Sequence, residues 1–249
     1  MAFLDIGQGD AIYIQAPNGR QMVVDGGPKE TLMARIPEHM TFSDKTIDIL
    51  VVTNPDLDHY SGFLPLLDMY EIGAVVEPGT TNDFGMYREL QDKIEKENVP
   101  HILAKKGQRI ILDAEKNVYF EILFPDRNVS SWDPNDGSII GMLVYGDTSF
   151  LLTGDATALA EGIVVAGSDV SDVDVLKIAH HGSKTSSGLP LLREASPDLA
   201  VISAGKDNRY GHPAKMIIDR LRSLGIPYLV THEEGGIVCT SDGIIVSCK

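Results

Sequence analysis

The apolar run in residues 46–54, TIDILVVTN, is the feature that most limits the possible folds. Its apolar residues follow one another without regular alternation, which is typical of strands buried on both faces of a sheet. Such a strand needs further layers of structure on each side of its sheet. With 249 residues, of which 43% are hydrophobic, the chain is long enough to bury a core of that size.

The other predicted elements follow from periodicity and turn residues. Alternating apolar residues around a Pro-Asn-Gly turn predict a hairpin over residues 11–27, and a second hairpin is expected over residues 109–125. Further strands are expected over residues 74–79, 141–155, 174–187, 199–205, 228–232, 236–240 and 243–248. Helices are expected over residues 61–72, 84–99, 156–165 and 213–225, and after Ser186. This order favours an α/β protein with packed sheets and outer helices over a doubly wound parallel sheet.

No Pro- or Ser-rich linker, repeat or low-complexity tract divides the chain, so we expect residues 1–249 to form a single domain. No apolar run approaches the ~20 residues of a membrane span and no signal-peptide core follows Met1, so we expect no membrane contact within this chain. Because the sequence opens abruptly on a strand-like segment, we favour a domain cut from a longer protein over a complete soluble one. Cys239 and Cys248 allow one cross-link between neighbouring strands, which leaves the compartment open.

The formal charge of −15 argues against an extended basic surface for nucleic acid or anionic membranes. A polyanionic substrate would therefore need a local cation, and a bound divalent metal would supply one. Lys184, Lys206 and Arg209 are the basic residues that we expect near such a substrate.

Polar clusters follow four of the apolar runs, at the points where strands are expected to end. They are Asn54, Asp56, Asp58 and His59 after the first run, then Asp155, then His180 and His181, and finally His212. Side chains at the ends of separate strands converge on one edge of a sheet. Carboxylates and imidazoles that converge in this way form a metal-ligand set.

Each cluster also has an ordinary structural explanation. Asp56 and Asp58 suit a turn or a helix cap, and Asp155 suits the cap of the helix that follows it. The two adjacent histidines suit a loop or a core, and His212 precedes a proline at a favoured helix start. A coincidence of all four explanations is rarer than any one of them, so together the clusters predict a metal site.

The motifs also carry a family resemblance. FLDIGQGDAIYIQAPNGRQMVVDGG, TNPDLDHYSG, FLLTGDA, LKIAHHGSKTSS and SAGKDNRYGHP resemble, in order and spacing, those of the metallo-β-lactamase superfamily. More narrowly, the chain is similar to the hydrolase domain of the ComEC competence proteins, which take up DNA through the cell envelope. The resemblance implies a four-layer αββα sandwich with the metal centre at one edge, and it admits an extracytoplasmic domain of a membrane protein as well as a soluble protein.

The resemblance also implies a ligand set for one or two divalent ions, Mn²⁺ or Zn²⁺. Asp58 and His59 match ligands of the second metal, Asp155 matches the carboxylate that bridges two metals, and His181, with His180 as the alternative, matches a further ligand. Asn54 and Asp56 stand where the superfamily signature has its first two histidines. Oxygen ligands at these two places shift the metal preference of the site away from Zn²⁺ toward a harder ion such as Mn²⁺, or they leave the first metal position weakly occupied or empty.

Catalytic and substrate-binding residues are expected around that centre. A metal-activated water would attack phosphorus, while His180 or His212 protonates the leaving oxygen or holds a phosphate. Donors for phosphate oxygens are expected from Ser183, Lys184, Thr185 and Ser186. Asn135, Asp136 and Ser138 lie where relatives carry a loop that faces the metals, and they suit either that role or an ordinary loop.

Three functions are compatible with this pattern. The favoured one is a metal-dependent phosphodiesterase or nuclease of the ComEC type that acts on DNA, including single-stranded DNA, during uptake. The second is a hydrolase of the same fold for another ester, such as a phosphorylcholine esterase or, less suited to this ligand set, a β-lactamase. The third is a degenerate domain that binds a substrate or partner without turnover, for which Asn54 is the support.

Overall fold

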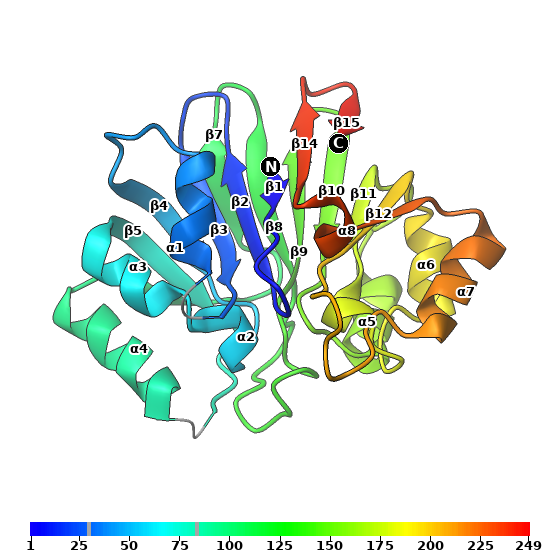
Figure 1. Cartoon of the computed structure of the whole chain (residues 1–249), viewed down its shortest axis with the longest axis horizontal. Helices are drawn as coiled ribbons and strands as arrows, with labels where there is room; N and C mark the ends of the chain where they lie inside the picture. Colours follow the sequence, from blue (N-terminus) through cyan, green and yellow to red (C-terminus); the bar gives the residue numbers. More distant parts are fainter. Residues whose placement is uncertain (29–30, 83–84) are drawn as a thin grey trace.

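The computed structural model describes residues 1–28, 31–82 and 85–249. Two sheets pack face to face, and helices cover their outer faces (Figure 1). Helices α1, α3 and α4 lie outside one sheet, and α5, α6 and α7 lie outside the other. The predicted four-layer αββα sandwich is confirmed.

The first sheet has the strand order β15-β14-β1-β2-β3-β4-β5-β6. Its strands are β1 Ala2–Phe3, β2 Ala11–Gln15, β3 Gln21–Gly26, β4 Thr46–Val51, β5 Glu71–Glu77, β6 His101–Leu103, β14 Ile237–Ser241 and β15 Val246–Cys248. The pairs from β3 to β6 are parallel, and the others are antiparallel.

The second sheet has the order β13-β12-β11-β10-β9-β8-β7. Its strands are β7 Arg109–Asp113, β8 Val118–Phe124, β9 Ile140–Tyr145, β10 Thr148–Leu152, β11 Val175–Lys177, β12 Leu199–Ile202 and β13 Tyr228–Val230. The pairs from β10 to β13 are parallel, so the carboxyl ends of these four strands share one edge.

The helices are α1 Leu32–Arg35, α2 Leu57–Tyr60, α3 Phe63–Met69, α4 Gly85–Lys96, α5 Ala158–Gly167, α6 Leu189–Ala195, α7 Lys215–Leu224 and α8 Thr231–Glu234. Short 3₁₀ turns cover Ile36–Glu38 and Ala179–Gly182. Phe84, where the predicted helix over residues 84–99 begins, lies outside the described residues.

Two of the predicted strands were wrong in extent. The segment 141–155 forms two strands, β9 and β10, because the chain reverses at Gly146, which has a φ of 58°. The segment 174–187 leaves the sheet after Lys177. Its two histidines have left-handed backbone angles, with φ of 51° and 54°, and a strand cannot continue through them.

The apolar run of β4 is buried on both faces, as its sequence predicted. Ile47 and Leu50 pack with Phe63 of α3 on the helix side. Val51 packs between the two sheets, in a cluster that includes Phe120 of the second sheet. Burial on both sides of β4 fixes the point where the chain leaves the sheet for the polar loop that follows.

The C-terminal hairpin carries the one cross-link that the sequence allowed. Cys239 and Cys248 are partners in the β14–β15 register and form a disulfide. Among the described residues, no helix combines the length and the apolar character that crossing a membrane requires.

Candidate metal centre

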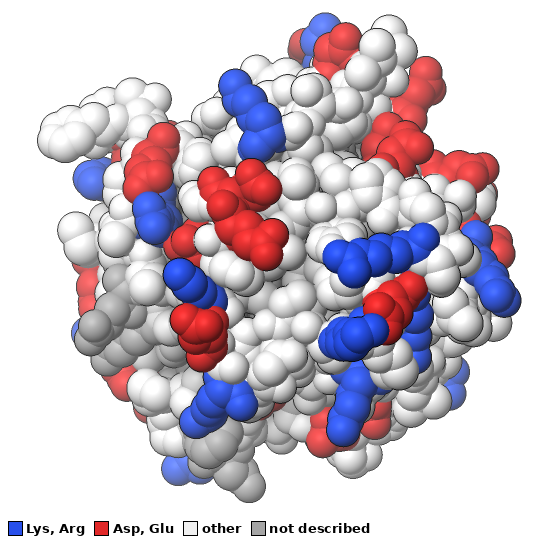
Figure 2. Space-filling model, turned by 45° about the vertical axis from the view of Figure 1, so that its right-hand side comes forward, with Lys and Arg blue, Asp and Glu red and all other residues white. Residues whose placement is uncertain are grey.

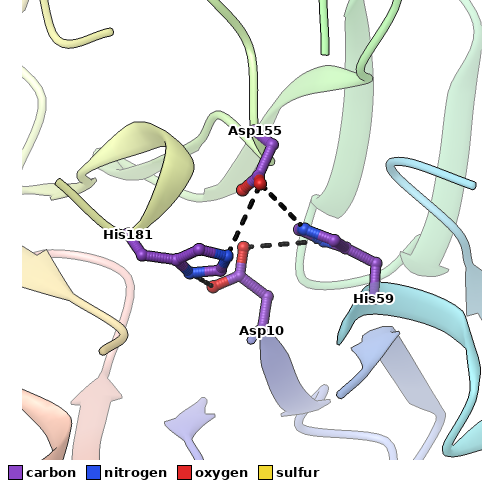
Figure 3. Close-up of side chains that lie close together, drawn as sticks. All are labelled: Asp10, His59, Asp155 and His181. Atoms are coloured by element: carbon purple, nitrogen blue, oxygen red, sulfur yellow. Dashed lines mark ion pairs between the residues drawn. The ribbon is translucent and has the colours of Figure 1, made fainter. Parts of the chain in front are cut away.

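Four buried side chains from distant parts of the chain meet where the two sheets approach each other (Figure 3). Asp10 precedes β2, His59 lies in α2, Asp155 follows β10, and His181 lies in the 3₁₀ turn after β11. One nitrogen or oxygen atom from each lies within 4.8 Å of the corresponding atoms of the other three. The structure thus brings together three of the predicted ligands and adds Asp10.

Asp155 lies between the two histidines. Its Oδ2 is 3.1 Å from Nε2 of His59 and 3.5 Å from Nε2 of His181. Asp10 completes the group, with its Oδ1 3.5 Å from Nδ1 of His181. Asp155, for which the resemblance implied a metal-bridging role, thus lies against both predicted imidazole ligands.

The backbone places these groups through glycine and left-handed residues. Gly9, with a φ of 133°, passes so close to α2 that a Cβ atom there would lie 2.4 Å from the carbonyl oxygen of Asp58. The same oxygen accepts a hydrogen bond from the backbone N–H of Asp10 at 3.1 Å. The loop before β2 therefore fits against α2 only with glycine at position 9, and this contact positions Asp10.

Each histidine is oriented by a partner at its other ring nitrogen. Nδ1 of His59 is 2.9 Å from Oδ2 of Asp25, and Nδ1 of His181 is 3.0 Å from the carbonyl oxygen of Ser203. Asp25 is itself fixed by hydrogen bonds from the backbone N–H and the hydroxyl of Thr53, at 2.7 and 2.6 Å. With Nδ1 engaged in this way, Nε2 of each ring is left to act as a ligand.

The centre contains a fifth ionisable group that is also buried. The ammonium of Lys177 forms an ion pair with Asp10 and donates to the carbonyl oxygen of Gly154 at 2.8 Å. Burial by itself raises the pKa of Asp10, but Lys177 and the two histidines outweigh it and lower this pKa to about 2. Asp10 is thus held ionised in the interior of the protein.

The pKa shifts of Asp155, His59 and His181 have the same origin. Burial by itself opposes charge on Asp155, His59 and His181, but their mutual attraction is larger. It holds the pKa of Asp155 well below its ordinary value and raises the pKa of both histidines well above theirs. The carboxylates therefore stay charged, and a cation could replace the protons of the imidazoles.

The donor set fits a divalent metal ion. Nε2 of His59, Nε2 of His181 and Oδ1 of Asp155 are buried and have no hydrogen-bond partner among the described residues. Buried polar atoms of this kind are costly unless something binds them. Imidazole nitrogens and carboxylate oxygens are the ligands that Zn²⁺ and Mn²⁺ accept in proteins.

The two aspartates of the sequence cluster lie toward the mouth of the centre. Oδ2 of Asp58 is 3.4 Å from Nε2 of His181, and 33% of its side chain is exposed. Oδ1 of Asp56 accepts a hydrogen bond from Asn82 at 2.8 Å. Asp58 is thus close enough to contribute to the centre, whereas Asp56 is engaged by a neighbouring loop.

Asn54 is fully buried and has both ends of its amide in hydrogen bonds. Its NH₂ group donates to Oδ1 of Asn135 at 2.7 Å and to Oγ of Ser138 at 3.0 Å. Its oxygen accepts from the backbone N–H of Asp56 at 2.9 Å. Asn135 and Ser138, which the sequence placed near the substrate, therefore contact the strand-end loop through Asn54.

His180 and His212 lie beside the centre. Nε2 of His180 is 3.7 Å from Oδ2 of Asp155, and its ring is 5.8 Å from that of His212. Nδ1 of His212 is buried without a hydrogen-bond partner among the described residues. His180 thus lies next to Asp155, and His212 lies next to His180.

The four predicted phosphate donors after His181 differ in their placement. Ser183 is nearly buried and pairs with the Thr185 hydroxyl at 3.0 Å, while Lys184 is exposed. The expectation for Ser186 is corrected, because its buried hydroxyl donates to the carbonyl oxygens of Ala179 and of Ser183. With its single proton used there, Ser186 stabilises the loop and has none to donate to a phosphate.

Sequence reasoning missed Asp10, Asp25 and Lys177. Asp10 precedes a strand, so the rule that sites gather at the carboxyl ends of strands does not find it. Asp25 stands beside two glycines at the end of the predicted hairpin, where nothing marks it as part of the site. Lys177 is the last residue of β11, after two apolar residues. Only its ion pair with Asp10 in the structure shows that it belongs to the centre.

Comparison with known proteins places the chain in a family. A family model described as the metallo-beta-lactamase superfamily matches residues 4–206. ComE operon protein 3 of Bacillus subtilis is 29% identical over 254 residues, which cover 94% of this chain and 32% of that protein. Competence protein ComA of Neisseria gonorrhoeae is 29% identical over 236 residues, which cover 94% of this chain and 31% of that protein. The chain thus spans about a third of the length of these relatives.

Solved structures agree on the fold. YhfI of Bacillus subtilis, a metallo-beta-lactamase fold protein, superposes with a TM-score of 0.61 at 11% identity, covering 100% of this chain and 98% of that one. A metallo hydrolase from Ignicoccus hospitalis gives a TM-score of 0.58 at 15% identity, covering 92% and 94%. The resemblance to competence proteins of the ComEC type is confirmed, and the chain belongs to the metallo-β-lactamase superfamily.

Proposed function

We propose that this chain is a metal-dependent phosphodiesterase that acts on DNA. The observation that carries the proposal is the pair of buried imidazoles around Asp155. Each has Nδ1 engaged by a partner, while Nε2 faces the Asp155 carboxylate and has no hydrogen-bond partner among the described residues. This arrangement prepares both rings to bind a cation, and a purely structural pair of histidines would have no need of it.

The ion would be held by His59, His181, Asp10 and Asp155, with Asp58 at the mouth. When bound, a divalent ion supplies Lewis acidity, which stabilises negative charge on phosphoryl oxygens and makes a water more acidic. Three carboxylates and two imidazoles form an oxygen-rich set. We therefore favour Mn²⁺ over Zn²⁺ and one tightly held ion over two.

The residues in front of the centre supply the proton chemistry. His180, whose side chain is 24% exposed, can reach a substrate and give a proton from its ring to the leaving oxygen. His212 lies against His180 and is placed to hold a phosphate oxygen. Ser183 and the exposed Lys184 follow in the same loop and can donate to the remaining oxygens.

A phosphodiester in DNA suits this chain better than other esters. The relatives that it matches are named as competence proteins, and the sequence has Asn54 and Asp56 in place of two zinc-site histidines of the superfamily signature. On the face in Figure 2, basic side chains gather in local groups between neutral and acidic ones. A polyanion would therefore be attracted at restricted places and by the ion itself.

We also propose that the chain acts as one domain of a longer, extracytoplasmic or membrane-attached protein. The Cys239–Cys248 disulfide supports an oxidising environment, because such bonds are rare where thiols are kept reduced.

The first test is hydrolysis of bis-p-nitrophenyl phosphate and single-stranded DNA by protein stripped of metal and resupplied with Mn²⁺ or Zn²⁺. We expect metal-dependent turnover of both substrates. It should be lost in Asp155→Ala and kept in Asp169→Ala, a control at an exposed aspartate outside the centre. Tight metal binding without turnover of either substrate would instead indicate another ester or a binding domain.

A further inference from the structure

The loop of residues 203–214, between β12 and α7, presents an aromatic ring at the mouth of the metal centre. Tyr210 is 53% exposed and stacks on His212, with 5.7 Å between the ring centroids and an angle of 22° between the planes. The His212 ring is in turn 6.4 Å from that of the buried His181. A row of three rings thus leads from the centre to the surface.

Arg209 extends this surface. Its guanidinium lies 4.7 Å from the centroid of the Tyr210 ring and donates to the Tyr210 hydroxyl. The guanidinium thus lies over the Tyr210 ring, and the two side chains form one cationic and aromatic platform.

The platform is held in place by Asn208. The side chain of Asn208 donates to the carbonyl oxygens of Gly205 and His212, and its oxygen accepts from the backbone N–H groups of Tyr210 and His212. These four bonds fix the loop from within. A ligand would thus find the platform already formed, with little ordering still to occur on binding.

A cleft of about 670 Å³ lies between this loop and α2. Tyr210, Arg209 and Asn208 line one side, and Asp56, Leu57 and Asp58 line the other. The cleft reaches the centre at Asp58, which is 3.4 Å from His181. Its partly buried Leu57 offers an apolar surface opposite the platform.

We propose that Tyr210 and Arg209 form a stacking subsite that takes a nucleobase of single-stranded nucleic acid next to the scissile phosphate. The inference rests on the proposed phosphodiesterase function and names the part of the substrate that the cleft recognises. Exposed aromatic rings and guanidinium planes are the groups on which unpaired bases stack, whatever the sequence. A base in this cleft places the neighbouring phosphate beside His212 and His180.

The same platform disfavours a quaternary ammonium ligand such as choline. Tyrosine rings bind such cations through their negative faces. Here the positively charged guanidinium of Arg209 already lies over the Tyr210 ring. A second cation would be repelled by Arg209, whereas a neutral, planar base would not.

The test compares two single-stranded oligomers of equal length, oligothymidylate and a fully abasic oligomer. Binding is measured by fluorescence anisotropy without added metal, and KM for cleavage is measured with Mn²⁺. We expect the wild-type protein to prefer the oligomer with bases in both assays. Tyr210→Ala should reduce that preference by about 10-fold to 100-fold, the range expected for the loss of one stacked base.

Tyr119→Ala is the matched control, because Tyr119 also lies under an arginine, with Arg109 4.5 Å from its ring centroid, but on β8. It should keep the wild-type preference. An unchanged preference in Tyr210→Ala, or equal weakening of both oligomers, would overturn the stacking subsite. Tighter binding of p-nitrophenyl phosphorylcholine than of either oligomer would overturn it in favour of a choline site.

Failure of the proposed function would give a different result. The wild-type protein would then cleave neither oligomer with any ion, while its binding preference between the two oligomers could still be measured.

Discussion

Nδ1 of His59 lies 2.9 Å from Oδ2 of Asp25, and both side chains are buried. His181 has an equivalent bond, but its partner is the backbone carbonyl of Ser203. The two histidines therefore differ in one respect that experiment can use. The orientation of His59 depends on a side chain, so a substitution can remove it without touching either ring.

Replacing Asp25 by Asn should weaken metal binding by about 10-fold to 100-fold, the usual effect of losing a partner behind a ligating histidine. The amide can still accept from Thr53, and Asn tolerates the left-handed backbone of Asp25, which has a φ of 59°. However, an NH₂ group facing Nδ1 favours the His59 tautomer with its proton on Nε2, which cannot ligate. Calorimetric titration with Mn²⁺ measures the change.

Asp48→Asn is the control for Asp25→Asn. Asp48 also accepts a backbone hydrogen bond within the first sheet, from Gln21 at 2.8 Å, but it has no hydrogen bond to a histidine among the described residues. The Asp48→Asn variant should bind Mn²⁺ with the same affinity as the wild-type protein. Unchanged affinity in Asp25→Asn would show that Asp25 does not set the tautomer of His59.

The ion pair of Lys177 and Asp10 should govern the stability of the metal-free protein. Lys177→Met removes the ammonium that pairs with the buried carboxylate of Asp10, which costs about 3–5 kcal/mol of unfolding free energy. Combining it with Asp10→Asn removes both charges, so the double variant should be more stable than the sum of the single losses predicts. Urea unfolding of the four proteins without metal completes the cycle. Additive losses would mean that the two groups do not interact.

The stability of the metal-free protein should also fall as the pH rises above neutrality. The pKa of His59 and of His181 is raised in the fold by the neighbouring carboxylates, although burial opposes this. Their contribution is therefore complete below the ordinary value of 6.5 and is lost as the pH rises through the raised pKa. For Asp10, whose pKa is lowered from 3.8 to about 2, the contribution is complete above 3.8 and is lost as the pH falls toward 2.

Thermal unfolding at about pH 6 and about pH 9, with and without Mn²⁺, tests this linkage. Without metal, the melting temperature should be higher at the lower pH. Mn²⁺ should raise it most at the higher pH, because the ion binds the deprotonated imidazoles. A metal-free protein that is more stable at the higher pH would contradict the assigned charge states.

The sequence predicted the parts of the site that follow a general rule of sheets. Asp155 and His181 follow β10 and β11, which are parallel neighbours, so their positions at one edge could be anticipated. His59 joins them from the other sheet, and the same rule indicated it, because it follows the end of β4. Asp10 could not be found in this way, because its place depends on the contact of Gly9 with α2.

The layers of the fold were predictable because β4 is apolar on both faces. The turns were harder, since a two-residue reversal at Gly146 and Asp147 leaves the apolar pattern of β9 and β10 almost continuous. The strand predicted through His180 and His181 failed for another reason. Left-handed angles at two adjacent histidines are set by the tertiary contacts of the site, and no local pattern indicates them.

Asn54 allows a test that separates a metal ligand from a residue that supports the loops. The structure places its amide in hydrogen bonds to Asn135, Ser138 and the backbone of Asp56. Asn54→Ala should therefore lower the unfolding free energy by about 1–3 kcal/mol, because it leaves buried polar groups unpaired. Its affinity for Mn²⁺ should stay close to that of the wild-type protein, with one tightly bound ion per chain.

Calorimetric titration and urea unfolding of Asn54→Ala, beside Asp155→Ala and Asn128→Ala, distinguish the two roles. Asn128 is an exposed asparagine that accepts a hydrogen bond from the backbone of Ser130, so its loss should change neither quantity. Asp155→Ala should abolish tight binding. If Asn54→Ala weakens Mn²⁺ binding more than about tenfold, which corresponds to 1.4 kcal/mol, Asn54 is a ligand after all. The first metal position that the signature predicts would then be filled through its amide oxygen.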